Sequence, residues 1–168
     1  VKADSYYANA VRWAAKNGIV VGDDVGTFRP DDSINREELA VILYRYAEFN
    51  GEGFVGNWAY KLAYEDAANI SSWAIKAVSY LSSFSKLMRR ILNNSNERFV
   101  PLSDEMEAVR LYLELESMRL GNRFSYEINI DSNLDADDIE IAPLIIQPFV
   151  ENAIIHGLVP KKENCILK

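Results

Sequence analysis

The chain has 168 residues, enough for one ordinary domain or two small ones, and 49% of them are hydrophobic and 26% charged, as is typical of globular proteins. Its 18 Lys and Arg against 25 Asp and Glu give a net charge of -7. This balance argues against a nucleic-acid partner, because such a partner requires a basic patch that displaces counterions. The one cysteine, Cys165, excludes an internal disulfide framework and a cysteine-based zinc cluster.

The first half of the sequence predicts short helices separated by glycine-rich turns. Residues 6–17 carry an apolar stripe at helical spacing, and Gly18 supplies the left-handed residue that ends the helix. Asn35 is expected to cap a second helix, with Glu38 as its capping-box partner. This helix is expected to run to Asn50-Gly51.

A weak internal repeat follows the second helix. Residues 73–80 echo residues 6–13 in the spacing of their aromatic and small apolar side chains. The second copy has no glycine turn after Leu81, and helical sequence continues instead to Asn93-Asn94. Because repeats need neighbours to bury their apolar faces, one repeat and a fraction predicts a marginal core.

The second half predicts a long helix and a small strand component. Ser103 is expected to cap a helix with Asp104, Glu105 and Glu107 in its first turn, where the helix dipole favours acids. Its predicted buried stripe consists of Met106, Val109, Tyr112 and Leu113, and its predicted end is Gly121.

The C-terminal part alternates between strand and helix signals. Residues 124–130 alternate apolar and polar side chains, which predicts a half-buried strand, and residues 139–141 predict a second short strand. Pro143 is expected near the start of a helix that runs to His156-Gly157. The expected fold class is therefore mainly α, with a small α+β part at the C-terminal end.

A spaced set of residues in the first half carries a family resemblance. They are Tyr6, Tyr7, Ala10, Val11, Trp13, Ala14, Gly18, Ile19, Val20, Gly22, Gly26, Phe28, Pro30 and Ile34–Glu38. This pattern resembles an S-layer homology (SLH) repeat over residues 4–50, with the start of another copy at residues 64–81. The resemblance implies an exported module that binds pyruvylated secondary cell-wall polysaccharide non-covalently, usually through three repeats.

The resemblance also implies a ligand-binding site at the start of the second helix. Asn35-Arg36-Glu37-Glu38 stands where the family has Thr-Arg-Ala-Glu, so Asn35 and Arg36 are the implied contacts. A guanidinium at a helix N-terminus can bind a ketal carboxylate through two hydrogen bonds, while Glu37 would oppose the anion. The alternative is that Arg36 is an ordinary solvated residue. Three aromatic residues are expected in the core rather than as sugar platforms: Trp13, Phe28 and Trp73.

A second resemblance covers residues 79–158. It is carried by Phe84, Leu87, Met88, Arg89, Leu92, Pro101–Ser103, Glu105, Glu107, Tyr112, Leu113, Leu115, Glu116, Arg119, Phe124, Tyr126 and Ile128. These residues resemble the internal region of LytS-like sensor histidine kinases. Residues 141–157 then resemble the opening helix of a GHKL-type ATPase domain, which carries the N box in that family.

The kinase resemblance implies roles for three residues of this last helix. Asn152 would ligate Mg²⁺ through its amide oxygen, Glu151 would act as acid/base or position water, and His156 would lie near the phosphates. The alternative is an ordinary polar helix face. The family implies ATP and Mg²⁺ as cofactors of the intact kinase, but none is expected to bind this chain.

The departures from the kinase pattern affect the expected activity. The one histidine, His156, lies inside the N box, so no phospho-acceptor histidine is present, and the glycine-rich ATP-binding boxes are also missing from the sequence. We therefore expect no autokinase activity. The partners implied for this half are a second kinase chain or a response regulator.

The two resemblances divide the chain into three expected segments. Residues 1–81 are SLH-like, residues 82–121 are dimerisation or internal helices of a histidine kinase, and residues 122–168 are a truncated ATPase-domain start. The expected function is a fusion or fragment that joins a polysaccharide-binding module to a partial, inactive two-component sensor kinase. The alternatives are a purely cell-surface anchoring SLH protein and a non-functional gene fragment. Localisation stays open between the cell wall and the cytoplasmic side of the membrane.

Overall fold

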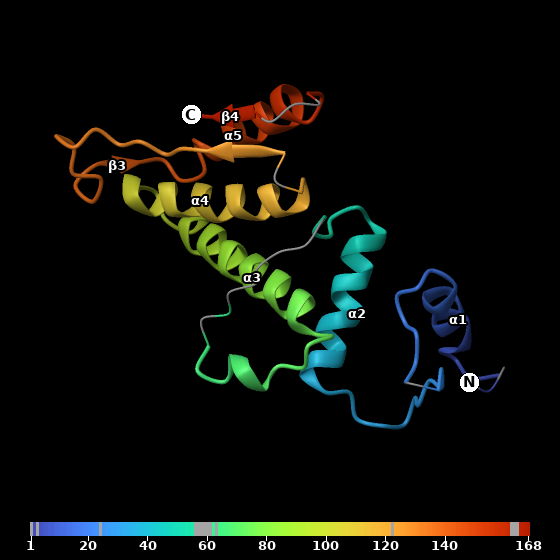
Figure 1. Cartoon of the computed structure of the whole chain (residues 1–168). Helices are drawn as coiled ribbons and strands as arrows, with labels where there is room; N and C mark the ends of the chain where they lie inside the picture. The colour runs from blue at the N-terminus through green and yellow to red at the C-terminus, as the bar shows by residue number, and fades with distance from the viewer. Residues whose placement is uncertain are drawn as a thin grey trace. The chain divides into compact units, whose positions relative to one another are not determined.

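The computed structural model divides the protein into two compact units. It describes residues 2, 4–23, 25–55, 62, 64–121, 123–161 and 165–168. The described residues up to Gly53 form the first unit together with those from 62 to Leu81, and Phe54, Val55 and Ser82–Lys168 form the second. The predicted fold class, mainly α with a small strand component, is confirmed (Figure 1). Among the described helices, none combines the length and apolarity required to cross a membrane.

The described residues of the first unit form helices joined by turns and irregular loops. It contains α1 (Ala8–Lys16), α2 (Arg36–Phe49), the 3-10 helix η1 (Ala67–Asn69) and the beginning of α3 (Ile75–Ser95). α1 ends as predicted, because Gly18 adopts the left-handed φ of 72° that a side chain would disfavour.

The two tryptophans expected in the core lie at the surface. Trp13 is 48% exposed and Trp73 is 55% exposed, so the prediction of core positions was wrong for both. Trp13 packs one edge against Phe49 with the ring centroids 5.5 Å apart, and this contact leaves much of the indole in solvent. Phe28 is half-buried.

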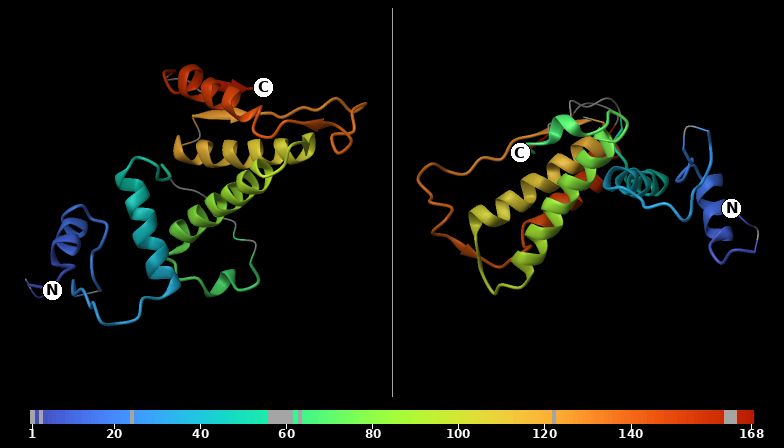
Figure 2. Two further views of the ribbon diagram at one scale, coloured as in Figure 1. Left: turned by 180° about the vertical axis from the view of Figure 1, so that it is seen from behind. Right: turned by 90° about the horizontal axis from the view of Figure 1, so that it is seen from below.

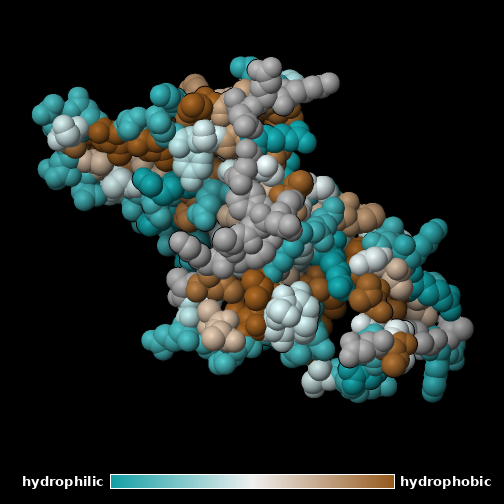
Figure 3. All heavy atoms as spheres, in the orientation of Figure 1, coloured by the Kyte–Doolittle hydropathy of each residue, from teal (hydrophilic) through white to brown (hydrophobic). Residues whose placement is uncertain are grey.

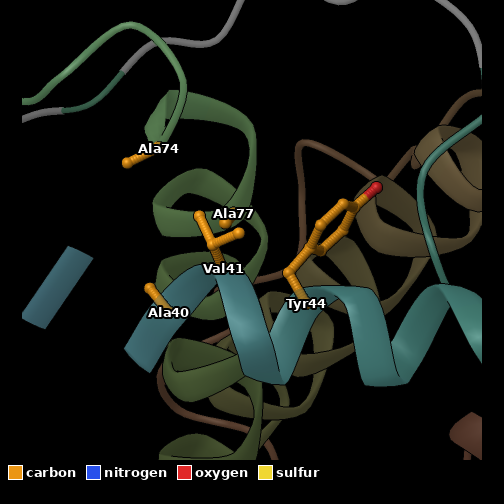
Figure 4. Close-up of a cluster of buried hydrophobic side chains, with 5 residues drawn as sticks. All are labelled: Ala40, Val41, Tyr44, Ala74 and Ala77. Atoms are coloured by element: carbon orange, nitrogen blue, oxygen red, sulfur yellow. The ribbon is translucent and has the colours of Figure 1, made fainter. Parts of the chain in front are cut away.

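The core of the first unit joins α2 to the start of α3. Figure 4 shows Val41 and Tyr44 of α2 beside Ala77 of α3, and Ala40 and Ala74 complete the buried cluster. Three of these five buried side chains are alanines, so the cluster buries little apolar surface.

A polar contact borders this core. Lys76 Nζ lies 2.9 Å from Glu48 Oε1 and 5.1 Å from the centroid of the Tyr44 ring. Burial lowers the pKa of Lys76, but hydrogen bonding to Tyr44 and Glu48 outweighs it, so the pKa lies above its usual value. The pair therefore supports the packing of α2 against α3.

The second unit combines the rest of α3 with one further long helix and two pairs of short strands. Its elements after α3 are β1 (Val100–Pro101), α4 (Leu102–Arg119), β2 (Phe124–Tyr126), β3 (Glu140–Ile141), α5 (Gln147–Asn152), the π-helix η2 (Ala153–Leu158) and β4 (Cys165–Leu167). β1 pairs with β3 antiparallel, and β2 pairs with β4 in parallel. Figures 1 and 2 show the C-terminal segments, orange to red, lying along α4.

The start of α4 differs from the prediction. Pro101 holds the N-cap position, so Ser103 lies inside the first turn and is not the cap. The reason is that carbonyls of another segment satisfy the free N–H groups of this turn. The Leu102 N–H donates to the Ile139 oxygen (2.7 Å) and the Ser103 N–H to the Ala136 oxygen (3.0 Å).

The C-terminal elements are shorter than predicted. The strand expected over residues 124–130 covers only 124–126, which are the residues that pair with Cys165–Leu167 of β4. The helix expected from Pro143 starts at Gln147, since Leu144 adopts a left-handed φ of 58° that no helix tolerates. The second strand expected, over residues 139–141, forms at Glu140 and Ile141 as β3.

The core of the second unit lies between α4 and the C-terminal elements. Val109 and Leu113 of α4 pack against Phe124 of β2 and Ile154 of η2. Full burial of a side chain such as Leu113 stabilises the fold by about 1.5–3 kcal/mol. Large apolar side chains also reach solvent in both units, and Figure 3 shows brown, apolar atoms among hydrophilic ones on the visible face.

Candidate functional site

The start of α2 holds the predicted capping box. The Asn35 Oδ1 accepts a hydrogen bond from the Glu38 N–H at 2.8 Å, and the Glu38 Oε2 accepts one from the Asn35 N–H at 2.9 Å. These two bonds satisfy N–H groups that an uncapped helix leaves free. The side-chain oxygen of Asn35 is therefore engaged in folding, and only its amide NH₂ is available to a ligand.

Arg36 occupies the first helical position beside this cap. Its side chain is exposed, and no residue in the described part of the chain pairs with it. The neighbouring Glu37 does have a partner: its Oε1 accepts a hydrogen bond from the Ser71 N–H at 2.8 Å. The Glu37 carboxylate thus joins α2 to the segment before α3, and Arg36 is left as the accessible charge at this helix start.

The second candidate site lies on α5 and η2. Asn152 ends α5 and His156 lies in η2, and both side chains are exposed. Glu151 is half-buried, and its Oε1 accepts a hydrogen bond from Gln147 Nε2 at 2.9 Å. The structure therefore exposes Asn152 and His156 but occupies one oxygen of Glu151 within its own helix.

These residues are compatible with one protein ligand to a magnesium ion. The Asn152 amide oxygen is a hard, exposed ligand, and Mg²⁺ in phosphate sites commonly takes one or two protein ligands beside waters and phosphates. The described residues contain no cluster of three or more His, Cys, Asp or Glu that could hold a metal by itself. A magnesium ion at Asn152 would consequently arrive with the phosphates that complete its shell.

Two features near α5 were missed in the sequence. Residues 153–158 form a π-helix, in which the Val159 N–H donates to the Ile154 oxygen at 2.8 Å, and no sequence pattern indicated it. Glu105 is completely buried, although an acid in a first turn is usually solvated. A signal for this burial exists, because Glu105 lies three and four residues before the buried Ala108 and Val109 and so shares their helix face.

Comparison with known families finds a match in each half of the chain, and the roles expected for Arg36, Asn152 and His156 stay predictions. Residues 1–40 match the model for the S-layer homology domain, and residues 67–124 match the model for histidine kinase. Both resemblances are confirmed. The chain therefore joins an SLH-like segment to a sensor-kinase-like segment. The kinase match begins within the predicted second SLH copy, at residues 64–81, and the segment boundaries of the chain stay predictions.

Individual relatives point to one group of sensors. The chain is 42% identical to the sensor protein LytS of Oceanobacillus iheyensis over 85 residues, which is 51% of this chain and 14% of that protein. It is 36% identical to LytS of Bacillus subtilis over 90 residues, or 54% of this chain and 15% of the relative. The sensor histidine kinase/phosphatase LytS of Staphylococcus aureus is 35% identical over 89 residues, 53% of this chain and 15% of the relative. The chain thus spans less than a sixth of these relatives, and no solved structure matches it significantly.

Proposed function

We propose that the first unit binds an anionic cell-wall polysaccharide of the pyruvylated type through Arg36. The observation that carries this proposal is an exposed, unpartnered arginine at the first position of a capped helix, within the residues that the structure describes. Its position is unfavourable for the fold, because a cation in the first turn faces the positive end of the helix dipole. An anion bound at this point would interact favourably with both the guanidinium and the dipole.

Co-sedimentation with purified cell wall tests this proposal. The protein should pellet with pyruvylated wall, and both depyruvylation of the wall and Arg36→Ala should abolish most of the binding. Arg12→Ala is the matched control, since Arg12 is an exposed arginine of α1 in the same unit and its loss changes the net charge equally. Equal binding to depyruvylated wall, or equal loss in both variants, would contradict a site at Arg36.

We also propose that the second unit is a part of a two-component sensor kinase that docks on a kinase chain or a response regulator and does not phosphorylate itself. The similarity to LytS sensors and the exposed Asn152 and His156 support the kinase origin. The inactivity is argued from the sequence, in which the single histidine is His156 of the N-box-like helix. Mg²⁺ and ATP would be held by Asn152 and His156 only where further kinase elements enclose them.

Incubation with γ-labelled ATP and Mg²⁺ tests this second proposal. No label should be incorporated into the protein alone, and incorporation would refute the argument from the missing acceptor histidine. Labelling that disappears in His156→Gln would identify His156 itself as the acceptor and would equally refute the proposal.

A further inference from the structure

A buried carboxylate connects α4 to the start of the N-box-like helix. Glu105, which is 0% exposed, accepts hydrogen bonds from two backbone groups that lie about forty residues later in the chain. The Leu144 N–H donates to Oε2 at 2.9 Å, and the Ile146 N–H donates to Oε1 at 3.1 Å. Both oxygens of one charged group are thus occupied by the segment that precedes α5.

The two N–H groups that Glu105 binds belong to residues with an unusual backbone conformation or at a helix start. Leu144 has a φ of 58°, in the left-handed region that costs a residue with a side chain about 1–2 kcal/mol. Ile146 is the N-cap of α5, and its own side chain makes no capping hydrogen bond. Because Glu105 is fully buried and these hydrogen bonds are partly buried, the carboxylate takes the place of solvent as the acceptor of both N–H groups.

The segment that Glu105 holds also packs one side of α5 and η2 against α4. Ile146, Val150 and Ile154 pack with the α4 cluster of Val109 and Leu113. Phe149 is 73% exposed and belongs with Asn152 and His156 to the solvent-exposed positions. Glu105 therefore supplies the polar contacts at the start of this segment, and the cluster with Val109 and Leu113 supplies the apolar ones.

We propose that Glu105 is a tether that holds residues 144–158 on α4, and that this segment detaches as one local unit when the carboxylate is lost. The tether makes the presentation of Asn152 and His156 depend on α4. The tether proposal rests on the proposed function only for the roles of Asn152 and His156. Its test needs no nucleotide, so failure of the tether and failure of the kinase proposal are distinguishable.

Residue-resolved amide hydrogen exchange on Glu105→Gln tests the tether. Because hydrogen bonds to charged groups contribute more than neutral ones, exchange at Leu144 and Ile146 should accelerate by about tenfold or more. The amides of residues 147–158 should also lose protection from exchange, while those of α4 keep their wild-type protection. Glu107→Gln is the matched control, since Glu107 lies two residues away and is partly exposed beside Arg110, and it should change exchange by less than about twofold.

A second pair of variants separates a tether from a general loss of stability. Val109→Ala weakens the same core without touching the hydrogen bonds, so exchange should rise across α4 and the C-terminal elements alike. Glu105→Asp keeps the charge but has a side chain one carbon shorter, so its carboxylate should no longer reach the N–H groups of residues 144 and 146. It should raise exchange in the same residues that Glu105→Gln affects, and it replaces Glu105→Gln in the test if Glu105→Gln folds poorly. Exchange at residues 144 and 146 within twofold of wild type, or a rise in Glu105→Gln as uniform as in Val109→Ala, would overturn the proposal.

Discussion

Asn35→Ala and Arg36→Ala change neighbouring residues at the start of α2, and we expect only Asn35→Ala to destabilise the protein. Asn35→Ala removes the acceptor of the Glu38 N–H and with it one half of the capping box. Arg36→Ala removes a side chain that makes no described contact and replaces it with the strongest helix former. The pair thus separates the residue that supports the fold from the residue proposed to bind the ligand.

The expected magnitudes follow from the geometry. Both capping-box bonds are exposed, so Asn35→Ala should destabilise the first unit by about 1 kcal/mol, within the range of N-cap substitutions. In a unit of this size, that loss corresponds to a fall in Tm of about 4–8 °C. Arg36→Ala relieves an unfavourable charge at the helix dipole and should leave stability unchanged or raise it by up to about 0.5 kcal/mol.

Thermal unfolding followed by circular dichroism measures these differences, and amide exchange in α2 assigns them to the correct helix. Residues 39–41 should lose protection in Asn35→Ala and keep it in Arg36→Ala. The reasoning is refuted if Arg36→Ala destabilises the protein as much as Asn35→Ala does. It is equally refuted if Asn35→Ala has no effect on α2.

Two further predictions concern the second unit. Leu113→Ala should destabilise it by about 2–5 kcal/mol because the side chain is fully buried, and a lower urea midpoint for loss of the β2 and α4 signals measures this. Burial, assisted by the charge of Glu114, raises the pKa of Tyr126 above its usual value. The raised pKa means that the unfolded chain loses the Tyr126 proton at a lower pH than the folded protein does. The stabilising contribution of Tyr126 should therefore be complete below its pKa in the unfolded chain and should be lost as pH rises toward its pKa in the folded protein. Wild type should therefore lose more stability than Tyr126→Phe between about pH 9 and pH 11, and equal losses would contradict the shift.

Local patterns carried most of what the sequence predicted correctly. The Asn35–Glu38 box and the left-handed Gly18 depend on residues three or four positions apart, so their signals are complete within one turn. The features that were missed depend on partners distant in the chain. Glu105 is bound by the segment around Leu144, and β2 consists of the three residues that pair with β4. The core position expected for Trp13 was wrong because its packing against Phe49, which lies far along the chain, covers only part of the indole.

The helix α3 places a practical limit on studying the two halves alone. Ala77 in its first turn belongs to one core, while Arg90 near its other end pairs with Asp104 of the second unit. Cutting the chain at the division after Leu81 would leave the first piece with a seven-residue stub, too short to hold a helix in water by itself. Recombinant halves should therefore overlap, each retaining the whole of Ile75–Ser95, and limited proteolysis should not release them cleanly at that point.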